Sequence, residues 1–213
     1  MKYIYVVLIK AHTGLGKVAR TFSRYEYTHV AVSLDRTLTD FVTFSRRKHF
    51  LPLDAGFMHE YRDYYAFGNH RRVKIKAFKV PVAEQNYNEI IRFISKLEND
   101  SEYIFNLFSM MTMPILLGFE IYKAYNCMSF TARVVELTGA VKLKRPYYKY
   151  SIKDMEQLLQ KHEYFEGNIA RKSSCDYAQY MKKFNVSNIL STGAGTIFNL
   201  TKRLLFSRNR NEN

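Results

Sequence analysis

The feature that most constrains this fold is a strand carrying a histidine and, far along the chain, a helix that begins with a cysteine. Residues 28–34 alternate in character and are rich in β-branched side chains, which predicts a β-strand with His29 near its start. Beyond Cys127 the apolar residues recur at helical spacing, namely Phe130, Val134 and Leu137. We therefore expect an α+β fold in which Cys127 occupies the first turn of a helix.

These two residue types on these two elements suit nucleophilic chemistry. A thiol is most acidic at a helix N-terminus, where free backbone N–H groups and the helix dipole stabilise the thiolate. A nearby imidazole can take its proton, so Cys127 and His29 are a candidate nucleophile and base. Each residue alone has a plainer interpretation, since a lone cysteine in an apolar helix is usually a small core residue and a lone histidine is usually structural.

Length and cysteine content narrow the class of protein. A chain of 213 residues with 47% hydrophobic residues can bury one substantial core, so one main domain is expected. The two cysteines, Cys127 and Cys175, are too few for a disulfide framework or a cysteine-based zinc site, which favours a reducing compartment. Residues 1–9 read as a buried strand rather than a signal peptide, so we expect a cytoplasmic protein. The other histidines have no metal-ligand spacing, and we expect neither metal nor cofactor.

The formal net charge of +14 predicts attraction to anionic surfaces such as nucleic acid or acidic lipid headgroups. The basic residues are spread along the chain and form no zinc-finger, RRM or KH motif, so no specific nucleic-acid partner is predicted. A solvated basic surface is an equally good interpretation of this charge.

Several other segments have a clear period. Residues 40–45 suit the second strand of a hairpin, and residues 73–80 alternate apolar and basic side chains as a half-exposed strand that Pro81 would end. Residues 84–98 predict a helix lying on the sheet through one apolar face, made of Tyr87, Ile90, Ile91, Ile94 and Leu97. Gly139 suits the C-terminal cap of the Cys127 helix, and Ser151 with Asp154 suits the start of another.

Two apolar segments raise the question of membrane contact. Residues 103–119 are the most hydrophobic of the chain, but polar residues and Pro114 interrupt them, which favours a buried or partner-facing segment over a membrane span. Composition turns polar and basic near residue 170, where we place a boundary before a C-terminal tail, residues 171–213. Residues 194–206 predict a short, weakly amphipathic basic helix in that tail. Packing on the main domain is the commonest outcome for such a helix, with an anionic membrane surface or a partner helix as alternatives.

Five segments together resemble the motifs of a known enzyme group. They are residues 27–35, 42–46, 56–60, 126–130 and 164–167. They are similar to motifs of the circularly permuted papain-like cysteine hydrolases, which include the YiiX-like amidases and are related to the NlpC-like cell-wall peptidases and to lecithin:retinol acyltransferase. The resemblance covers residues 1–170, and the order of His29 before Cys127 is what the permutation predicts. Met128 after the cysteine and Val42-Thr43-Phe44-Ser45-Arg46 on the second strand depart from the usual pattern.

The resemblance implies a permuted papain-like fold, an antiparallel sheet packed with helices, and thiol hydrolase activity of the amidase or peptidase type. Cys127 would attack an amide or ester carbonyl with His29 as base, and a thioester would form. Relatives orient the imidazole with a polar residue on the next strand, about a dozen residues after the histidine, where Phe41 stands here. A shifted register must then bring in Thr43, Ser45 or Asp40. Thr43 is the choice by motif position, and Glu60 is the outside candidate.

Two further questions stay open at the level of sequence. The backbone N–H of Cys127 could stabilise an oxyanion, with the Tyr27 hydroxyl as a weak second donor. The substrate could be a peptide, a cell-wall fragment or a lipid ester, resolved by water or by another acyl acceptor. The competing hypothesis is an inactive or acyltransferase-like relative that serves as a basic module at a membrane or nucleic acid, including peripheral membrane attachment through the tail.

Overall fold

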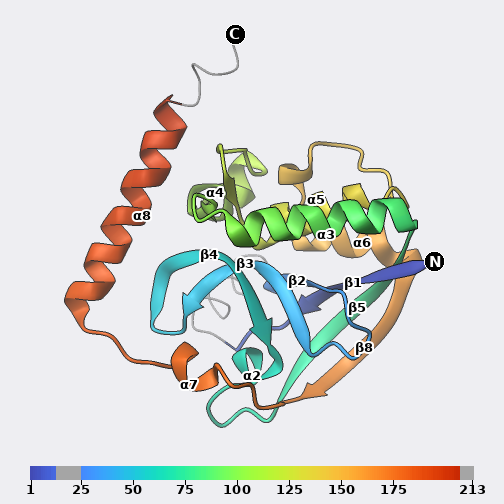
Figure 1. The fold of residues 1–213 in the computed structure, drawn as a ribbon, viewed down its shortest axis with the longest axis horizontal. Coiled ribbons are helices and arrows are strands. Elements are labelled where there is room, and N and C mark those ends of the chain that lie inside the picture. The colour runs from blue at the N-terminus through green and yellow to red at the C-terminus, as the bar shows by residue number, and fades with distance from the viewer. Residues whose placement is uncertain (13–24, 207–213) are drawn as a thin grey trace.

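The computed structural model describes residues 1–12 and 25–206, which form an α+β structure on one eight-stranded sheet (Figure 1). In order across the sheet the strands are β7 (Ala124–Tyr125), β6 (Ile104–Phe105), β4 (Leu51–Tyr61), β3 (Asp40–Lys48), β2 (His29–Ser33), β1 (Lys2–Ile9), β5 (Arg72–Val82) and β8 (Glu163–Ala170). All neighbours are antiparallel except β6 and β7. The expected antiparallel sheet is therefore a mixed one, because the segment between these two short strands crosses over before pairing.

The sheet is buried on both faces, and β1 shows why. Its side chains alternate, so that Ile4, Val6 and Leu8 enter one hydrophobic core while Tyr5, Val7 and Ile9 enter a second. A strand covered on both sides carries a continuous apolar run instead of an alternating one. The run at the N-terminus is therefore a central strand, flanked by β2 and β5.

Helices cover the two faces unequally. The larger core lies between the sheet and α3 (Glu84–Asn99), α5 (Cys127–Leu137) and α6 (Ile152–Leu159), which lie together on one side in Figure 1. The smaller core lies under two short helices, α2 (Arg62–Tyr65) and α7 (Tyr177–Tyr180). Two short 3₁₀ turns, η1 (Tyr147–Lys149) and η2 (Gln160–His162), flank α6.

Most local predictions are confirmed, with shifted ends. The strand with His29 and the helix that begins at Cys127 are present, and Gly139 has a φ of +67° just past the end of α5. Ser151 and Asp154 form the capping box of α6. The prediction that Pro81 ends its strand is wrong, because β5 continues to Val82 and pairs Pro81 with Tyr3. The β8 ladder on the other side of β5 has ended by Phe78, so the missing N–H of Pro81 costs no ladder hydrogen bond.

The α3 helix differs from its prediction at one position. Ile90, Ile94 and Leu97 are buried as expected, but Ile91 is 37% exposed and lies off the packed face. A helix on a sheet buries a stripe that is narrower than its full set of apolar residues, and Ile91 lies at the margin of that stripe.

Helices α4 (Leu107–Leu116) and α8 (Val186–Phe206) lie at one end of the sheet. The 103–119 segment forms β6 and then α4, while α8 is longer than the short helix predicted over 194–206. Tertiary contacts extend α8 upstream. Gly193 lies against Leu53 of β4, and the Thr196 hydroxyl donates to the Leu53 carbonyl over 2.9 Å. In the described ranges no helix is both long and apolar enough to cross a membrane.

Candidate active site

The site lies where β2 and β3 separate. Only Val32 and Val42 are registered as a pair between these strands, and the Thr43 hydroxyl donates to the Val30 carbonyl over 2.9 Å just beyond that pair. No further pair between β2 and β3 is formed from Val32 toward His29. Helix α5 contacts both strands at this separation, which brings the residue at its first turn toward the start of β2.

His29 is held from the side of the sheet opposite α5. Its Nε2 lies 2.7 Å from Oε2 of Glu60, a residue of β4, two strands away. The two side chains are 14% and 4% exposed, so this ion pair is largely removed from solvent. A buried pair of this kind holds the ring in one orientation, because rotation would leave the carboxylate without a partner.

Cys127 approaches the same imidazole from α5. Its side chain interacts with His29, and this contact and Glu60 both raise the pKa of the ring. Nε2 of the ring is bonded to Glu60, which leaves Nδ1 as the other ring nitrogen. His29 therefore has two partners in the site, the carboxylate of Glu60 and the thiol of Cys127.

The Asn126 side chain builds the helix start that carries Cys127. Its Oδ1 accepts from the Ser129 backbone N–H over 2.8 Å, and the Ser129 hydroxyl accepts from the Asn126 backbone N–H over 2.9 Å. This reciprocal cap fixes the first turn and leaves the Cys127 N–H with no hydrogen bond to any part of the chain that the structure describes. That N–H points away from the helix body, as an oxyanion donor requires.

The electrostatics of the site favour a charged His29. Burial by itself would lower the pKa of this imidazole, but the Glu60 carboxylate and the interaction with Cys127 outweigh burial and raise the pKa of His29 to about 10. Burial also opposes ionisation of Glu60, yet its pKa is lowered, because His29, Tyr65 and Ser45 all stabilise the carboxylate. At neutral pH the pair is therefore an imidazolium and a carboxylate.

A tyrosine completes the support of Glu60. Tyr65, on the short helix α2 that directly follows β4, donates its hydroxyl to Oε2 of Glu60 over 2.7 Å. Its ring is 4% exposed and lies 5.9 Å from the His29 ring, measured between centroids. Both the position and the charge of Glu60 are thus set by buried neighbours.

The candidates for the third position have different surroundings. Glu60 is the candidate that bonds His29. Thr43, the choice by motif position, donates its hydroxyl to the Val30 carbonyl instead. Asp40 lies at the far end of β3 and bonds His59 Nδ1 over 3.1 Å. Ser45 reaches the Glu60 carboxylate and so belongs to the surroundings of the site.

Tyr27, the weak candidate for an oxyanion donor, is turned toward a different cluster. Its hydroxyl donates to Glu166 Oε1 over 2.9 Å, and its side chain is 4% exposed within the larger core. This hydrogen bond, together with Lys76 and Lys74, lowers the pKa of Glu166 to about 2. Tyr27 would have to leave Glu166 before it could donate to a substrate.

Two supporting residues were not foreseen from the sequence. Asn126 had a readable signal, because Asn followed three residues later by Ser before an apolar helix is a capping pattern. Tyr65 had none, since its role depends on α2 folding back over the strand that carries Glu60.

The second cysteine lies away from this site. Cys175 is exposed, in the tail between β8 and α7. Across residues 1–12 and 25–206, no three His, Cys, Asp or Glu side chains are grouped so that they could hold a metal ion.

Comparisons of the chain with protein-family models, curated proteins and solved structures found no match. The chemical interpretation of the site consequently depends on its own geometry.

Proposed function

We propose that this protein is a cysteine hydrolase that cleaves an amide or ester bond by way of a thioester on Cys127, with His29 as acid and base and Glu60 as the residue that orients His29. The observation that carries the proposal is the buried pair of His29 and Glu60 beside Cys127, whose thiol lies on the first turn of a helix and interacts with His29. A circularly permuted papain-like fold is part of the same proposal.

The chemistry follows from a charged imidazole beside the sulfur. Cys127 attacks the substrate carbonyl carbon as a thiolate, and the Cys127 backbone N–H donates to the oxygen that becomes negative. As the C–N or C–O bond breaks, the imidazolium of His29 gives its proton to the leaving group. A thioester between Cys127 and the acyl group remains.

Water completes the cycle. Neutral His29 takes a proton from the attacking water, the C–S bond breaks, and the thiolate and the imidazolium are restored with release of a carboxylic acid. An alcohol or amine in place of water would give acyl transfer with the same residues. Glu60 stays ionised throughout, because its buried neighbours stabilise the carboxylate.

Alkylation of the two cysteines tests the proposal. Iodoacetamide at neutral pH is expected to modify Cys127 faster than Cys175, even though Cys175 is the more exposed thiol. His29→Ala should slow alkylation of Cys127 by about tenfold or more, since the thiolate loses its charged partner. The measurement is mass spectrometry of peptides over a time course.

His59→Ala is the matched control, because His59 is also paired with carboxylates but lies away from Cys127. It should leave the alkylation rate of Cys127 unchanged. Slow and equal modification of both cysteines, insensitive to His29→Ala, would refute the enzyme and favour the alternative of an inactive basic binding module. A panel of activated esters and thioesters, with the acyl group sought on Cys127 by mass, then separates hydrolysis from acyl transfer.

A further inference from the structure

Beyond the proposed reaction, the exposed sides of α4 and α8 carry large apolar side chains. Large apolar side chains lie on the outer surface of α4 and just past its end: Met111 is 67% exposed, Ile115 83%, Leu116 55% and Leu117 56%. On α8, Phe198 is 68% exposed and Leu205 64%. We call these six residues the α4–α8 apolar surface.

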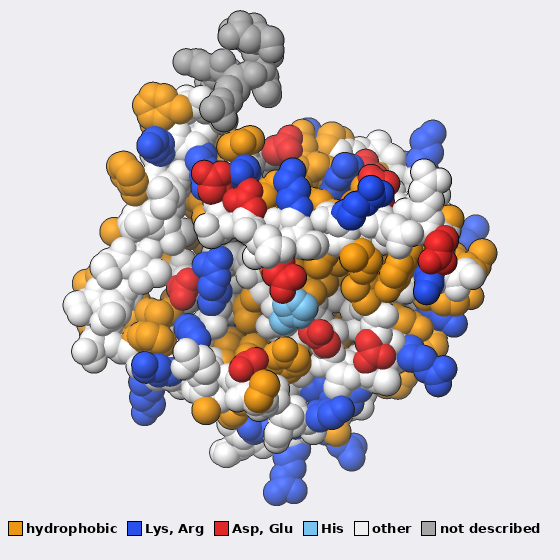
Figure 2. Space-filling model, in the orientation of Figure 1, with side chains coloured by type: hydrophobic (Ala, Val, Ile, Leu, Met, Phe, Trp, Pro, Cys, Tyr) orange, Lys and Arg blue, Asp and Glu red, His pale blue; other side chains and the backbone are white. Residues whose placement is uncertain are grey.

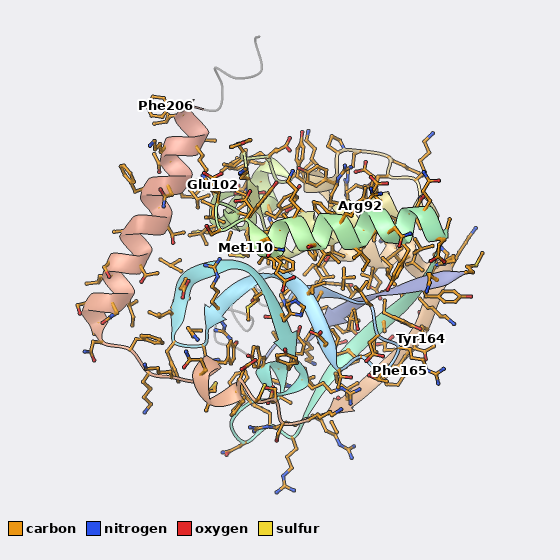
Figure 3. All side chains as sticks on the ribbon, viewed as in Figure 1. Arg92, Glu102, Met110, Tyr164, Phe165 and Phe206 are labelled. Atoms are coloured by element: carbon orange, nitrogen blue, oxygen red, sulfur yellow. The ribbon has the colours of Figure 1, made fainter. Side chains whose placement is uncertain are left out.

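The two helices are joined through a small core of their own. Leu200 of α8 is fully buried with Ile121 and Ala124, and Leu107 and Phe108 of α4 pack against the same cluster. Their inner sides are therefore used in packing, and the outer residues are left over at one end of the molecule. Figure 3 labels Met110 of α4, next to Met111, and Phe206 at the end of α8, next to Leu205.

The backbone after α4 turns sharply through a left-handed cap. Leu117 has a left-handed φ of 54° and Gly118 follows with a φ of +80°, while the Tyr148 carbonyl lies so close to Gly118 that any side chain there would clash. A left-handed conformation is costly for leucine. Here Leu117 is the C-cap of α4, its N–H donates to the Met113 carbonyl, and its side chain remains exposed.

Charge distinguishes among possible partners. No charged residue occurs between residues 103 and 119, but lysines are exposed on α8 and on the segment after α5. Lys142, Lys144 and Lys149 belong to the segment that meets Gly118 through Tyr148, and Lys202 lies on α8. The nearby Asp100 and Glu102 are both paired with Lys123. Figure 2 shows hydrophobic side chains with Lys and Arg among them along α8 and the edge near α4.

We infer that the α4–α8 apolar surface docks on an anionic lipid bilayer, with the apolar side chains entering the interface and the exposed lysines contacting the headgroups. Exposed apolar side chains beside an exposed cation, as Phe198 and Leu205 are beside Lys202 on α8, are the combination that an anionic bilayer attracts. A second copy of this chain fits less well, because each copy carries a formal charge of +14 and would bring like charge to the same contact.

Binding to vesicles tests the inference. The full chain should float with phosphatidylcholine vesicles that contain about 30 mol % phosphatidylserine, bind pure phosphatidylcholine vesicles far more weakly, and lose affinity as salt is raised. The double variant Met111→Asp with Ile115→Asp should bind the anionic vesicles about tenfold more weakly or worse, since two side chains that enter the interface become charged. Both positions are exposed, so the fold should tolerate the change.

Val186→Asp is the matched control, because Val186 is 71% exposed but begins α8, at the opposite end of the helix from Phe206 (Figure 1). It should change vesicle affinity by less than about twofold. Cys127→Ser should bind as the wild-type chain does, so failure of the proposed reaction would leave this inference standing. Absence of binding, equal binding to neutral vesicles, or equal loss in the control would overturn it. So would light scattering that shows a dimer which the double variant dissociates, because the surface would then belong to a second copy.

Discussion

Neighbouring residues of β4 form two histidine–carboxylate contacts whose surroundings differ sharply. Glu60 holds His29 on the face of the smaller core, and both side chains are nearly buried. His59, one residue earlier, points to the opposite face, bonds Asp40 over 3.1 Å and lies 3.4 Å from Glu98 of α3, with all three side chains 37% exposed or more. The same pairing chemistry is thus placed in two dielectric environments by the alternation of a single strand.

The comparison teaches that burial rather than pairing makes the His29 site distinctive. In both pairs the carboxylates raise the pKa of the imidazole, but only for His29 must they first overcome nearly complete burial. Water and salt screen the His59 contacts, which therefore contribute little to stability. They join the surface of β4 to α3. The His29 pair instead keeps a charged imidazole in a site that solvent barely reaches.

The largest expected difference between the two pairs is in stability. Glu60→Ala should lower the free energy of unfolding by about 3–5 kcal/mol, because it leaves His29 without its carboxylate inside the protein. Asp40→Ala should cost less than about 1 kcal/mol, since an exposed pair contributes little. Urea unfolding followed by circular dichroism measures both. Equal losses would mean that the two pairs do not differ as their burial indicates.

The next difference is in titration. In the wild-type chain NMR of the imidazole protons should give His29 a pKa of about 10. In Glu60→Gln the pKa of His29 should fall well below its wild-type value, because burial is then opposed only by the interaction with Cys127. Asp40→Asn should lower the pKa of His59, because Asp40 is the main group that raises it, but by less than Glu60→Gln lowers that of His29, since His59 is more exposed and Glu98 remains. A His29 pKa that does not respond to Glu60→Gln would contradict the assigned pairing.

The same titration sets the direction of a pH effect on stability. A pKa raised in the folded state stabilises the fold fully below the unfolded value of 6.5 and ceases to do so as pH rises through about 10. The wild-type chain should therefore lose more unfolding free energy than Glu60→Gln between neutral pH and pH of about 10. This difference between the two chains cancels the titration of groups that they share.

The smallest expected effect concerns the residue behind Glu60. Tyr65→Phe removes one hydrogen bond to a buried carboxylate and should cost about 1–2 kcal/mol of unfolding free energy while raising the pKa of Glu60. Tyr64→Phe on the same short helix should cost less than about 0.5 kcal/mol, because its hydroxyl makes no hydrogen bond within the described ranges. Thermal and urea unfolding of the two variants provide the measurement. Equal effects would remove Tyr65 from the support of the site.

Local sequence patterns predicted much of the fold but only part of the site. The strand with His29, the helix that begins at Cys127 and the cap at Ser151 were all predicted, because each depends on residues within one or two turns of each other. The long strand β4 was not recognised as a strand, since its side chains are half-buried on both faces and show no clean alternation. The upstream half of α8 was also missed, because it is a stretch of weak helix formers such as Val186, Ser187 and Asn188.

The sequence by itself determined the secondary structure around His29 and Cys127 and the excess of basic charge. Only the tertiary structure decided that Glu60, and not a residue of β3, lies on His29, and that α4 and α8 leave apolar side chains uncovered. The physical reason is the period of two in a strand. Which face a residue takes, and which partner it meets across the sheet, depends on a register that distant strands and helices settle together when they pack.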